Sequence, residues 1–232
     1  MSEPIPAANA AAASQSNGTA APSLPRIGER APDFRAVTTH GELTFSEWAG
    51  DHWVVLFSHP ADFTPVCSTE LLEFARRAPE FVERGTRLIG LSVDSVHAHL
   101  AWVQNLKERA GVSIEYPLIS DVTGKIARRY GMFHPHETDT ATVRAVFFID
   151  PKRTVRATIY YPLNVGRSVD EILRVLDGLQ TTDAHSVAVP VNWKPGEQVI
   201  VPPPKTQEQV AEREQGSYDE RVDFYLVKKS LS

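Results

Sequence analysis

The sequence predicts an α/β domain in which helices cover a mixed central β-sheet. Short apolar runs alternate with helical patterns along the chain, as they do in layered α/β domains. Several runs are too uniformly apolar to keep one face in water, so they should be central strands. The short turn at 150–153 separates two of the runs and predicts an antiparallel hairpin late in the sheet.

The expected elements follow in chain order. Strands are expected at 34–38, 43–45, 53–58, 87–93, 117–119, 144–150 and 155–161, and helices at 65–84, 97–109, 124–130, 169–179 and 207–215. Thr64 and Pro65 supply an N-cap and a proline at the first helical position of the helix 65–84. Ser168, with Glu171 three residues later, has the capping-box spacing that opens the helix 169–179.

Composition divides the chain into three parts. Residues 1–25 are rich in Ala, Ser, Asn and Pro and have no targeting pattern, so we expect a disordered tail. Residues 26–184 are the expected domain, and a chain of 232 residues with 42% apolar side chains can bury a core of that size. Residues 185–232 are Pro-rich and irregular, and we expect an extension that packs on a second subunit.

Composition and spacing also exclude several classes of function. The net charge of −5 and the scarcity of basic clusters argue against nucleic acid, and no apolar run is long enough to span a membrane. A single unpaired cysteine suits a reducing compartment, so we expect the cytoplasm. His97 with His99, and His134 with His136, lack the geometry or the further ligands of a metal site, so we expect none.

Cys67 is the only cysteine, so it cannot form an internal disulfide. Its place in the first turn of a helix favours the thiolate, because backbone N–H groups and the helix dipole stabilise negative charge there. Thiolate formation alone gives a modest gain, since nucleophilicity falls as a thiol becomes more acidic. The site must also activate the electrophile. Thr64 can offer its hydroxyl across the first turn, and a guanidinium from elsewhere could hold the thiolate and receive oxyanion charge.

The motif Pro60-x-x-x-Thr64-x-x-Cys67 resembles the active-site pattern of the peroxiredoxin family, and Arg144 matches that family's arginine. The resemblance implies a thioredoxin-like fold. It also implies that Cys67 attacks the O–O bond of hydrogen peroxide or an alkyl hydroperoxide and becomes a sulfenic acid. Thr64 and Arg144 would position the peroxide and stabilise the leaving oxygen, while Pro60 shields the sulfur.

His59 and the segments 62–67 and 167–174 are similar to the one-cysteine, peroxiredoxin-6-like group of that family. The similarity runs from about residue 24 to near the C-terminus. Two supporting roles follow from it. Glu70 would hydrogen-bond within the active-site network and pair with Arg167, and His59 would contact the catalytic cysteine or its oxidised form.

Two absences decide the subgroup. Leu72 stands where relatives with a disulfide inside one subunit carry a second cysteine, and Val189 stands at the resolving position before the Trp-Lys-Pro-Gly segment. The resemblance therefore implies a cofactor-free thiol peroxidase recycled by an external thiol. Glutathione with glutaredoxin or a glutathione transferase, and thioredoxin, are all chemically able to do this. The resemblance also implies a homodimer, with larger rings left open.

Other interpretations of these residues stay open. A lone cysteine is most often a buried apolar residue, and Arg144 taken alone is most often a structural arginine at a strand edge. His59 can be a structural histidine, and Glu70 with Arg167 can be a structural ion pair. A different class of function is a redox-controlled holdase chaperone or peroxide-sensing interaction protein, in which oxidation of Cys67 changes assembly.

Overall fold

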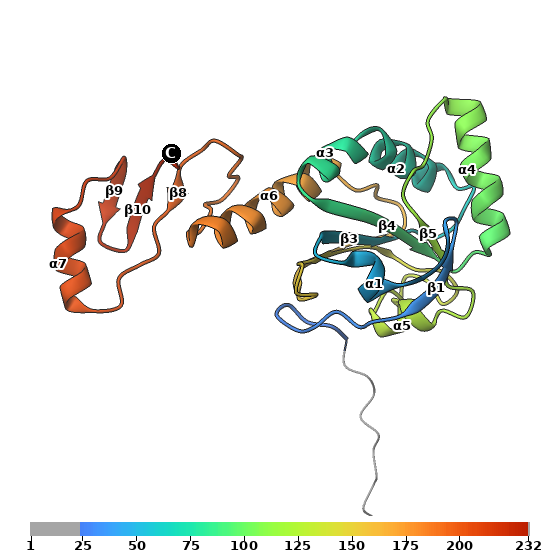
Figure 1. The fold of residues 1–232 in the computed structure, drawn as a ribbon, viewed down its shortest axis with the longest axis horizontal. Coiled ribbons are helices and arrows are strands. Elements are labelled where there is room, and N and C mark those ends of the chain that lie inside the picture. Colours follow the sequence, from blue (N-terminus) through green and yellow to red (C-terminus); the bar gives the residue numbers. More distant parts are fainter. Residues whose placement is uncertain (1–23, 232) are drawn as a thin grey trace, which may run out of the picture.

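The computed structural model describes residues 24–231, so the tail expected at 1–25 lies almost entirely outside the described part. A seven-stranded sheet forms the centre of the molecule, in the order β2-β1-β5-β4-β3-β6-β7 (Figure 1). Its strands are β1 (Arg35–Thr38), β2 (Gly41–Thr44), β3 (Trp53–Ser58), β4 (Thr86–Ser92), β5 (Leu118–Ser120), β6 (Arg144–Ile149) and β7 (Val155–Tyr161).

The sheet is mixed, as the sequence predicts. Strand β4 pairs in parallel with β3 and β5, whereas β6 pairs antiparallel with both β3 and β7. The turn between β6 and β7 gives the expected hairpin, with Arg153 in the left-handed region at φ 64°. Strands β3 and β6 lie side by side and run in opposite directions. The carboxyl end of β3 therefore lies next to the amino end of β6.

Helices cover both faces of the sheet. The helices are α1 (Phe45–Ala49), α2 (Pro65–Arg76), α3 (Ala78–Glu83), α4 (Val96–Ala110), α5 (Lys125–Arg129), α6 (Val169–His185) and α7 (Gln207–Gln215). Val55 and Phe57 of β3 pack under α2, α3, α4 and α6, and Val54 and Leu56 pack under α1 and α5. Both sets of side chains are fully buried, which explains why β3 reads as one continuous apolar run.

Most elements lie within two residues of their predicted bounds, and three differences are more substantial. Phe45, expected in a strand, is the first residue of α1. The helix expected at 65–84 is two helices, which meet at Arg77 with φ −99° and ψ 3°. Pro79 explains the break, because a proline cannot donate to the preceding turn and its ring clashes with that turn. Helix α6 continues to His185, six residues past its expected end.

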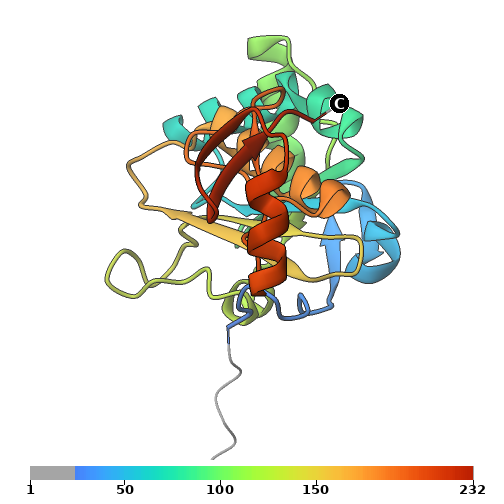
Figure 2. The ribbon, with the colours of Figure 1, turned by 90° about the vertical axis from the view of Figure 1, so that its left-hand side faces the viewer.

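The C-terminal extension carries structure that the sequence analysis missed. Besides the expected α7, it forms a three-stranded sheet of β8 (Val199–Ile200), β10 (Leu226–Lys229) and β9 (Glu220–Asp223). The extension follows α6 away from the main domain (Figure 1), and in Figure 2 it therefore lies in front of that domain. Arg213 holds it together, because its buried guanidinium donates to the carbonyl oxygens of Val201, Pro202 and Phe224.

Within residues 24–231, no helix is both long enough and apolar enough to cross a membrane.

Candidate active site

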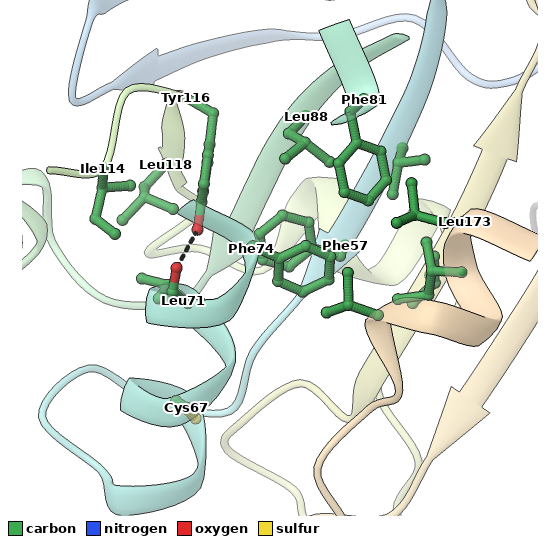
Figure 3. Close-up of a cluster of buried hydrophobic side chains, with 14 of the residues drawn as sticks. Phe57, Cys67, Leu71, Phe74, Phe81, Leu88, Ile114, Tyr116, Leu118 and Leu173 are labelled. Carbon is green, nitrogen blue, oxygen red and sulfur yellow. Dashed lines mark hydrogen bonds between the residues drawn. The ribbon is translucent and has the colours of Figure 1, made fainter. Parts of the chain in front are cut away.

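Cys67 lies in the first turn of α2, directly after the loop that leaves the carboxyl end of β3. Its side chain is completely buried and belongs to the apolar cluster between the sheet and α2, one turn before Leu71 (Figure 3). The loop turns sharply at Phe63, a non-glycine residue at φ 56°, which is a costly conformation for an L side chain. Helix α2 begins two residues after this strained turn, so Cys67 lies within the first turn, whose N–H groups have no partner inside the helix.

Thr64 occupies the N-cap position of α2 and Pro65 the first helical position, as predicted. The side chain of Thr64 does not cap the helix, however. Its hydroxyl donates to the carbonyl oxygen of Ala61 at 2.8 Å, and no hydrogen bond within residues 24–231 joins it to Cys67. The hydroxyl therefore donates into the turn before the helix, and its expected role toward Cys67 or a peroxide stays a prediction.

Arg144, the first residue of β6, reaches the sulfur. Its Nη1 lies 3.3 Å from Sγ of Cys67 and 2.7 Å from Oε2 of Glu70. Its Nε and Nη2 both donate to the carbonyl oxygen of Leu163, at 3.1 and 2.7 Å. The side chain is buried, so the guanidinium is held on three sides and presents one edge to the thiol.

Glu70 and Arg167 form the ion pair that the resemblance implies. Arg167 donates to Oε1 of Glu70 from its backbone N and from Nε, both at 2.9 Å, and to Oε2 from Nη2 at 2.7 Å. Its Nη1 donates to the carbonyl oxygens of Ser58 and Ala145 at 2.9 and 3.0 Å. Glu70 thereby connects Arg167 to Arg144 and fixes the position of the guanidinium that touches the thiol.

Arg144, Arg167 and Glu70 place one net positive charge beside the thiol. Burial raises the pKa of Glu70, but the guanidinium groups of Arg167 and Arg144 outweigh burial and hold that pKa below its usual value. Arg167 stacks on Phe57 and Phe74, with its Cζ 5.1 and 5.5 Å from the ring centroids. Two cations and one carboxylate leave one positive charge, which a thiolate at Cys67 would neutralise.

His59 is completely buried, and no hydrogen bond within residues 24–231 joins its ring to Cys67, so the contact with Cys67 or its oxidised form that the resemblance implies stays a prediction. Its Nε2 lies 2.9 Å from Oδ1 of Asp62, and the other oxygen of Asp62 lies 2.7 Å from Nδ1 of His99. Neither Asp62 nor His99 was expected to have a role, since His97 and His99 lack the geometry of a metal site. A sequence signal existed, because His59 and Asp62 are three residues apart in one loop, but nothing in the sequence marks α4 as the neighbour of that loop.

The same three side chains are the group within residues 24–231 whose ligand atoms lie close enough together to hold a metal ion. Each atom that faces the others already takes part in a hydrogen bond. The arrangement is therefore that of a hydrogen-bonded chain, and His97 and the His134–His136 pair do not belong to it.

Pro60 follows His59 and is partly buried. Its shielding of the sulfur stays a prediction.

Comparison with known proteins identifies relatives over nearly the whole chain. The AhpC/TSA family model matches residues 27–158, and the model of the C-terminal domain of 1-Cys peroxiredoxin matches residues 178–216. A peroxiredoxin from Aquifex aeolicus is 50% identical over 219 residues, covering 90% of this chain and 98% of the relative. Peroxiredoxin 2 from Caldanaerobacter subterraneus is 53% identical over 190 residues, covering 82% of this chain and 86% of the relative.

Solved structures give the same picture of the fold. A yeast mitochondrial 1-Cys peroxiredoxin superposes with a TM-score of 0.80 at 43% identity, over 89% of this chain and 99% of that one. A cysteine-to-serine mutant of peroxiredoxin 6 from Arenicola marina superposes with a TM-score of 0.80 at 38% identity, over 89% of this chain and 98% of that one. The thioredoxin-like fold with a C-terminal extension is thereby confirmed.

Proposed function

Because the chain belongs to the peroxiredoxin family, it is a thiol-dependent peroxidase, and we propose that Cys67 is its peroxidatic nucleophile. The observation that carries this proposal is the 3.3 Å contact between Nη1 of Arg144 and Sγ of Cys67 in the first turn of α2. The same comparisons lend no support to the holdase chaperone as an alternative.

The reaction follows from these positions. The Cys67 thiolate attacks one peroxide oxygen, the S–O bond forms, and the O–O bond breaks. The leaving oxygen keeps the bonding electrons, takes one proton, and departs as water or an alcohol. Arg144 holds the thiolate before the attack and receives the charge that develops on the leaving oxygen. Thiol plus hydroperoxide thus gives sulfenic acid plus water or alcohol.

Thr64 and Pro60 complete the peroxide pocket in this proposal. The proton of the Thr64 hydroxyl is donated to Ala61, so the lone pairs of Oγ1 are available to accept from the O–H of a peroxide. Pro60 has no N–H and adds no competing donor beside the sulfur. Glu70 and Arg167 act through Arg144, whose guanidinium they hold in place.

An external thiol restores the enzyme. Leu72 and Val189 occupy the two positions at which relatives carry a resolving cysteine, and Cys67 is the only cysteine of the chain. Sγ is completely buried, which favours a small thiol such as glutathione as the first reductant. Glutaredoxin, a glutathione transferase or thioredoxin would act next or in its place. For one structural relative, the yeast mitochondrial 1-Cys peroxiredoxin, the thiol-resolving mechanism is described as acting through glutathione and thioredoxin systems.

The unpaired cysteine also supports the reducing cytoplasm as the compartment.

A turnover assay with separate donors tests this proposal. With glutathione and glutaredoxin, the protein should consume many equivalents of hydrogen peroxide, and with no donor it should consume one. Glutathione transferase with glutathione, and thioredoxin with its reductase, are run in parallel at equal protein concentration. Consumption that stops at one equivalent with every donor would show that the proposed recycling by an external thiol is wrong.

We also propose a homodimer formed through β7 and the C-terminal extension. Within residues 24–231, β7 pairs with no named strand besides β6, and Gly28 and Glu29 bond to its outer edge only at Val155, so the rest of that edge offers unpaired backbone groups. A second copy could pair with this edge across a twofold axis. The extension lies away from its own domain (Figure 1) and exposes Val222, Phe224 and Tyr225, which supports its packing on a partner.

Sedimentation equilibrium tests this assembly. Twice the chain mass of 25.7 kDa is expected at micromolar concentration. Tyr225→Asp should lower the dimer fraction, because it places a charge on the exposed apolar face of the extension. Val82→Asp is the matched control, since Val82 is equally apolar and is 72% exposed on α3. A monomer mass for the unmodified chain, or equal loss of dimer in both variants, would contradict the proposed interface.

A further inference from the structure

The hydroxyl of Ser58 bonds to both peptide groups that flank Arg144. Ser58 is the last residue of β3 and is completely buried. Its Oγ donates to the carbonyl oxygen of Val143 at 2.5 Å and accepts from the backbone N of Ala145 at 3.1 Å. The first of these groups precedes Arg144 and the second follows it. One side chain therefore holds the backbone on both sides of the arginine, and the mechanism above does not use it.

These bonds lie where the backbone ladder between β3 and β6 ends. The last paired residues are Phe57 and Val146. The next pair in this register would be Ser58 and Ala145, and there the hydroxyl takes the N–H of Ala145 in place of a backbone carbonyl. The carbonyl oxygens of both residues accept from Nη1 of Arg167 instead. Side chains thus supply the hydrogen bonds that join the two strands at the amino end of β6.

A second hydroxyl continues this arrangement. Thr142 is completely buried, and its Oγ1 donates to the carbonyl oxygen of His59 at 2.8 Å. Thr142 lies two residues before Arg144, and His59 directly follows Ser58. The loop that leaves β3 and the segment that enters β6 are consequently joined by two hydroxyl groups in succession. Such bonds restrict a buried backbone, because breaking one leaves a carbonyl or N–H group without a partner.

The backbone position of Arg144 matters because the far end of its side chain is also held. Nε and Nη2 donate to the carbonyl oxygen of Leu163, and Nη1 lies 2.7 Å from Oε2 of Glu70 and 3.3 Å from Sγ of Cys67. With the guanidinium held in this way, the position of the Cα decides whether Nη1 reaches the sulfur. A misplacement of about 1 Å in a catalytic group can cost about a hundredfold in rate.

We propose that Ser58 and Thr142 are positioning residues, whose hydroxyl groups hold the backbone of Arg144 so that its guanidinium meets the thiolate and the leaving oxygen. This inference rests on the proposed roles of Cys67 and Arg144. The bonds to the guanidinium fix the far end of the side chain, and the two hydroxyl groups fix the end that joins the backbone. Both ends must be fixed, because a long side chain that is held at one end can still tilt.

Ser58→Ala is the first test. It removes both bonds to the peptide groups around Arg144, so the first oxidation step, measured by stopped flow with excess hydrogen peroxide, should slow about tenfold. Thr142→Val removes the second hydroxyl at nearly constant shape and should also slow this step, whereas Thr142→Ser keeps the hydroxyl and should keep the rate. An unchanged rate in Ser58→Ala overturns the inference, and so does an equal loss in the two Thr142 variants. The Thr142 pair decides if Ser58→Ala does not fold.

A double-mutant cycle separates positioning of the arginine from general damage to the fold. Arg144→Met removes the guanidinium and nearly conserves the length of the side chain. If the Ser58 hydroxyl acts through the guanidinium, Ser58→Ala should cause no further loss of rate in the Arg144→Met protein. The same loss with and without the guanidinium would show that Ser58 acts on the fold as a whole, which overturns the inference.

Thr38→Val is the matched control. Thr38 is also buried at the end of a strand, β1, and its hydroxyl also donates once and accepts once. The bonds are to the carbonyl oxygen of Gly41 at 2.8 Å and from the backbone N of His40 at 3.0 Å, both outside the site. The oxidation rate of Thr38→Val should equal that of the unmodified protein. A loss as large as that in Ser58→Ala would contradict a specific role of Ser58.

An NMR measurement examines the arginine without any reaction. The Nε–H of Arg144 is bonded to Leu163 in a buried site, so its exchange with water should be slow. Its ¹H–¹⁵N signal, assigned by its loss in Arg144→Met, should exchange faster in reduced Ser58→Ala than in the reduced unmodified protein. Equal exchange rates overturn the inference while leaving the proposed function intact. Failure of the unmodified protein to gain an oxygen at Cys67 contradicts the proposed function, and the exchange measurement still reports whether the hydroxyl holds the arginine.

Discussion

Replacement of Cys67 by serine is expected to abolish peroxide reduction, with a loss on the order of a thousandfold or more. The hydroxyl of a serine stays protonated at neutral pH and cannot attack the O–O bond as a thiolate does. Serine nearly conserves the shape of the buried side chain, so the apolar cluster around Leu71 and Phe74 should stay intact. The loss will then report the chemistry of the sulfur and not a damaged fold.

Peptide mass spectrometry is the right readout for this prediction. The chain has two methionines, which can also gain an oxygen, so the mass of the intact protein is ambiguous. With one equivalent of hydrogen peroxide, the Cys67 peptide should gain one oxygen within seconds, and the serine peptide should gain none. Thr69→Ser, an exposed neighbour on α2, should behave as the unmodified protein. Peroxide consumption by the serine variant at an undiminished rate would contradict the role of Cys67.

Local patterns predicted the site where a short segment carries the information. Thr64 and Pro65 mark the start of α2, and this start places Cys67 in the first helical turn. Arg144 lies 77 residues away, and its approach to the thiol could be expected only from the family resemblance. The structure supplies the physical reason for that approach. Strand β6 runs antiparallel beside β3, so its first residue lies level with the loop that joins β3 to α2.

The sequence could not reveal the contacts that depend on long-range packing of loops and helices. Asp62 and His99 meet across 37 residues, because α4 packs beside the loop that precedes α2. Strands β9 and β10 were missed for another reason. They are short, β9 is fully exposed, and only Val227 of the pair is buried. The apolar run at 224–227 lies partly in the turn between them, so it does not mark two strands. The direction of the Thr64 hydroxyl was also hidden, because Ala61 competes for its proton.

Replacement of Arg144 by lysine is expected to lower the rate of Cys67 oxidation by about a hundredfold, the usual loss for one preorganised donor at a developing oxyanion. The guanidinium uses three nitrogens at once, with Nε and Nη2 on Leu163 and Nη1 between Glu70 and the sulfur. A lysine has one nitrogen and cannot make the bonds to Leu163 and still present a donor to Sγ. The positive charge remains, so the loss should come from geometry.

Stopped-flow measurement of the first oxidation step, with hydrogen peroxide in excess, isolates this effect from recycling. Arg84→Lys is the matched control, because Arg84 also makes a two-nitrogen pair, with Asp177, but lies at the end of α3 outside the site. Its oxidation rate should equal that of the unmodified protein. If Arg144→Lys stays within about threefold of the unmodified rate, a positive charge near the sulfur is sufficient. The fixed orientation that Glu70 and Leu163 impose on the guanidinium would then contribute nothing to catalysis.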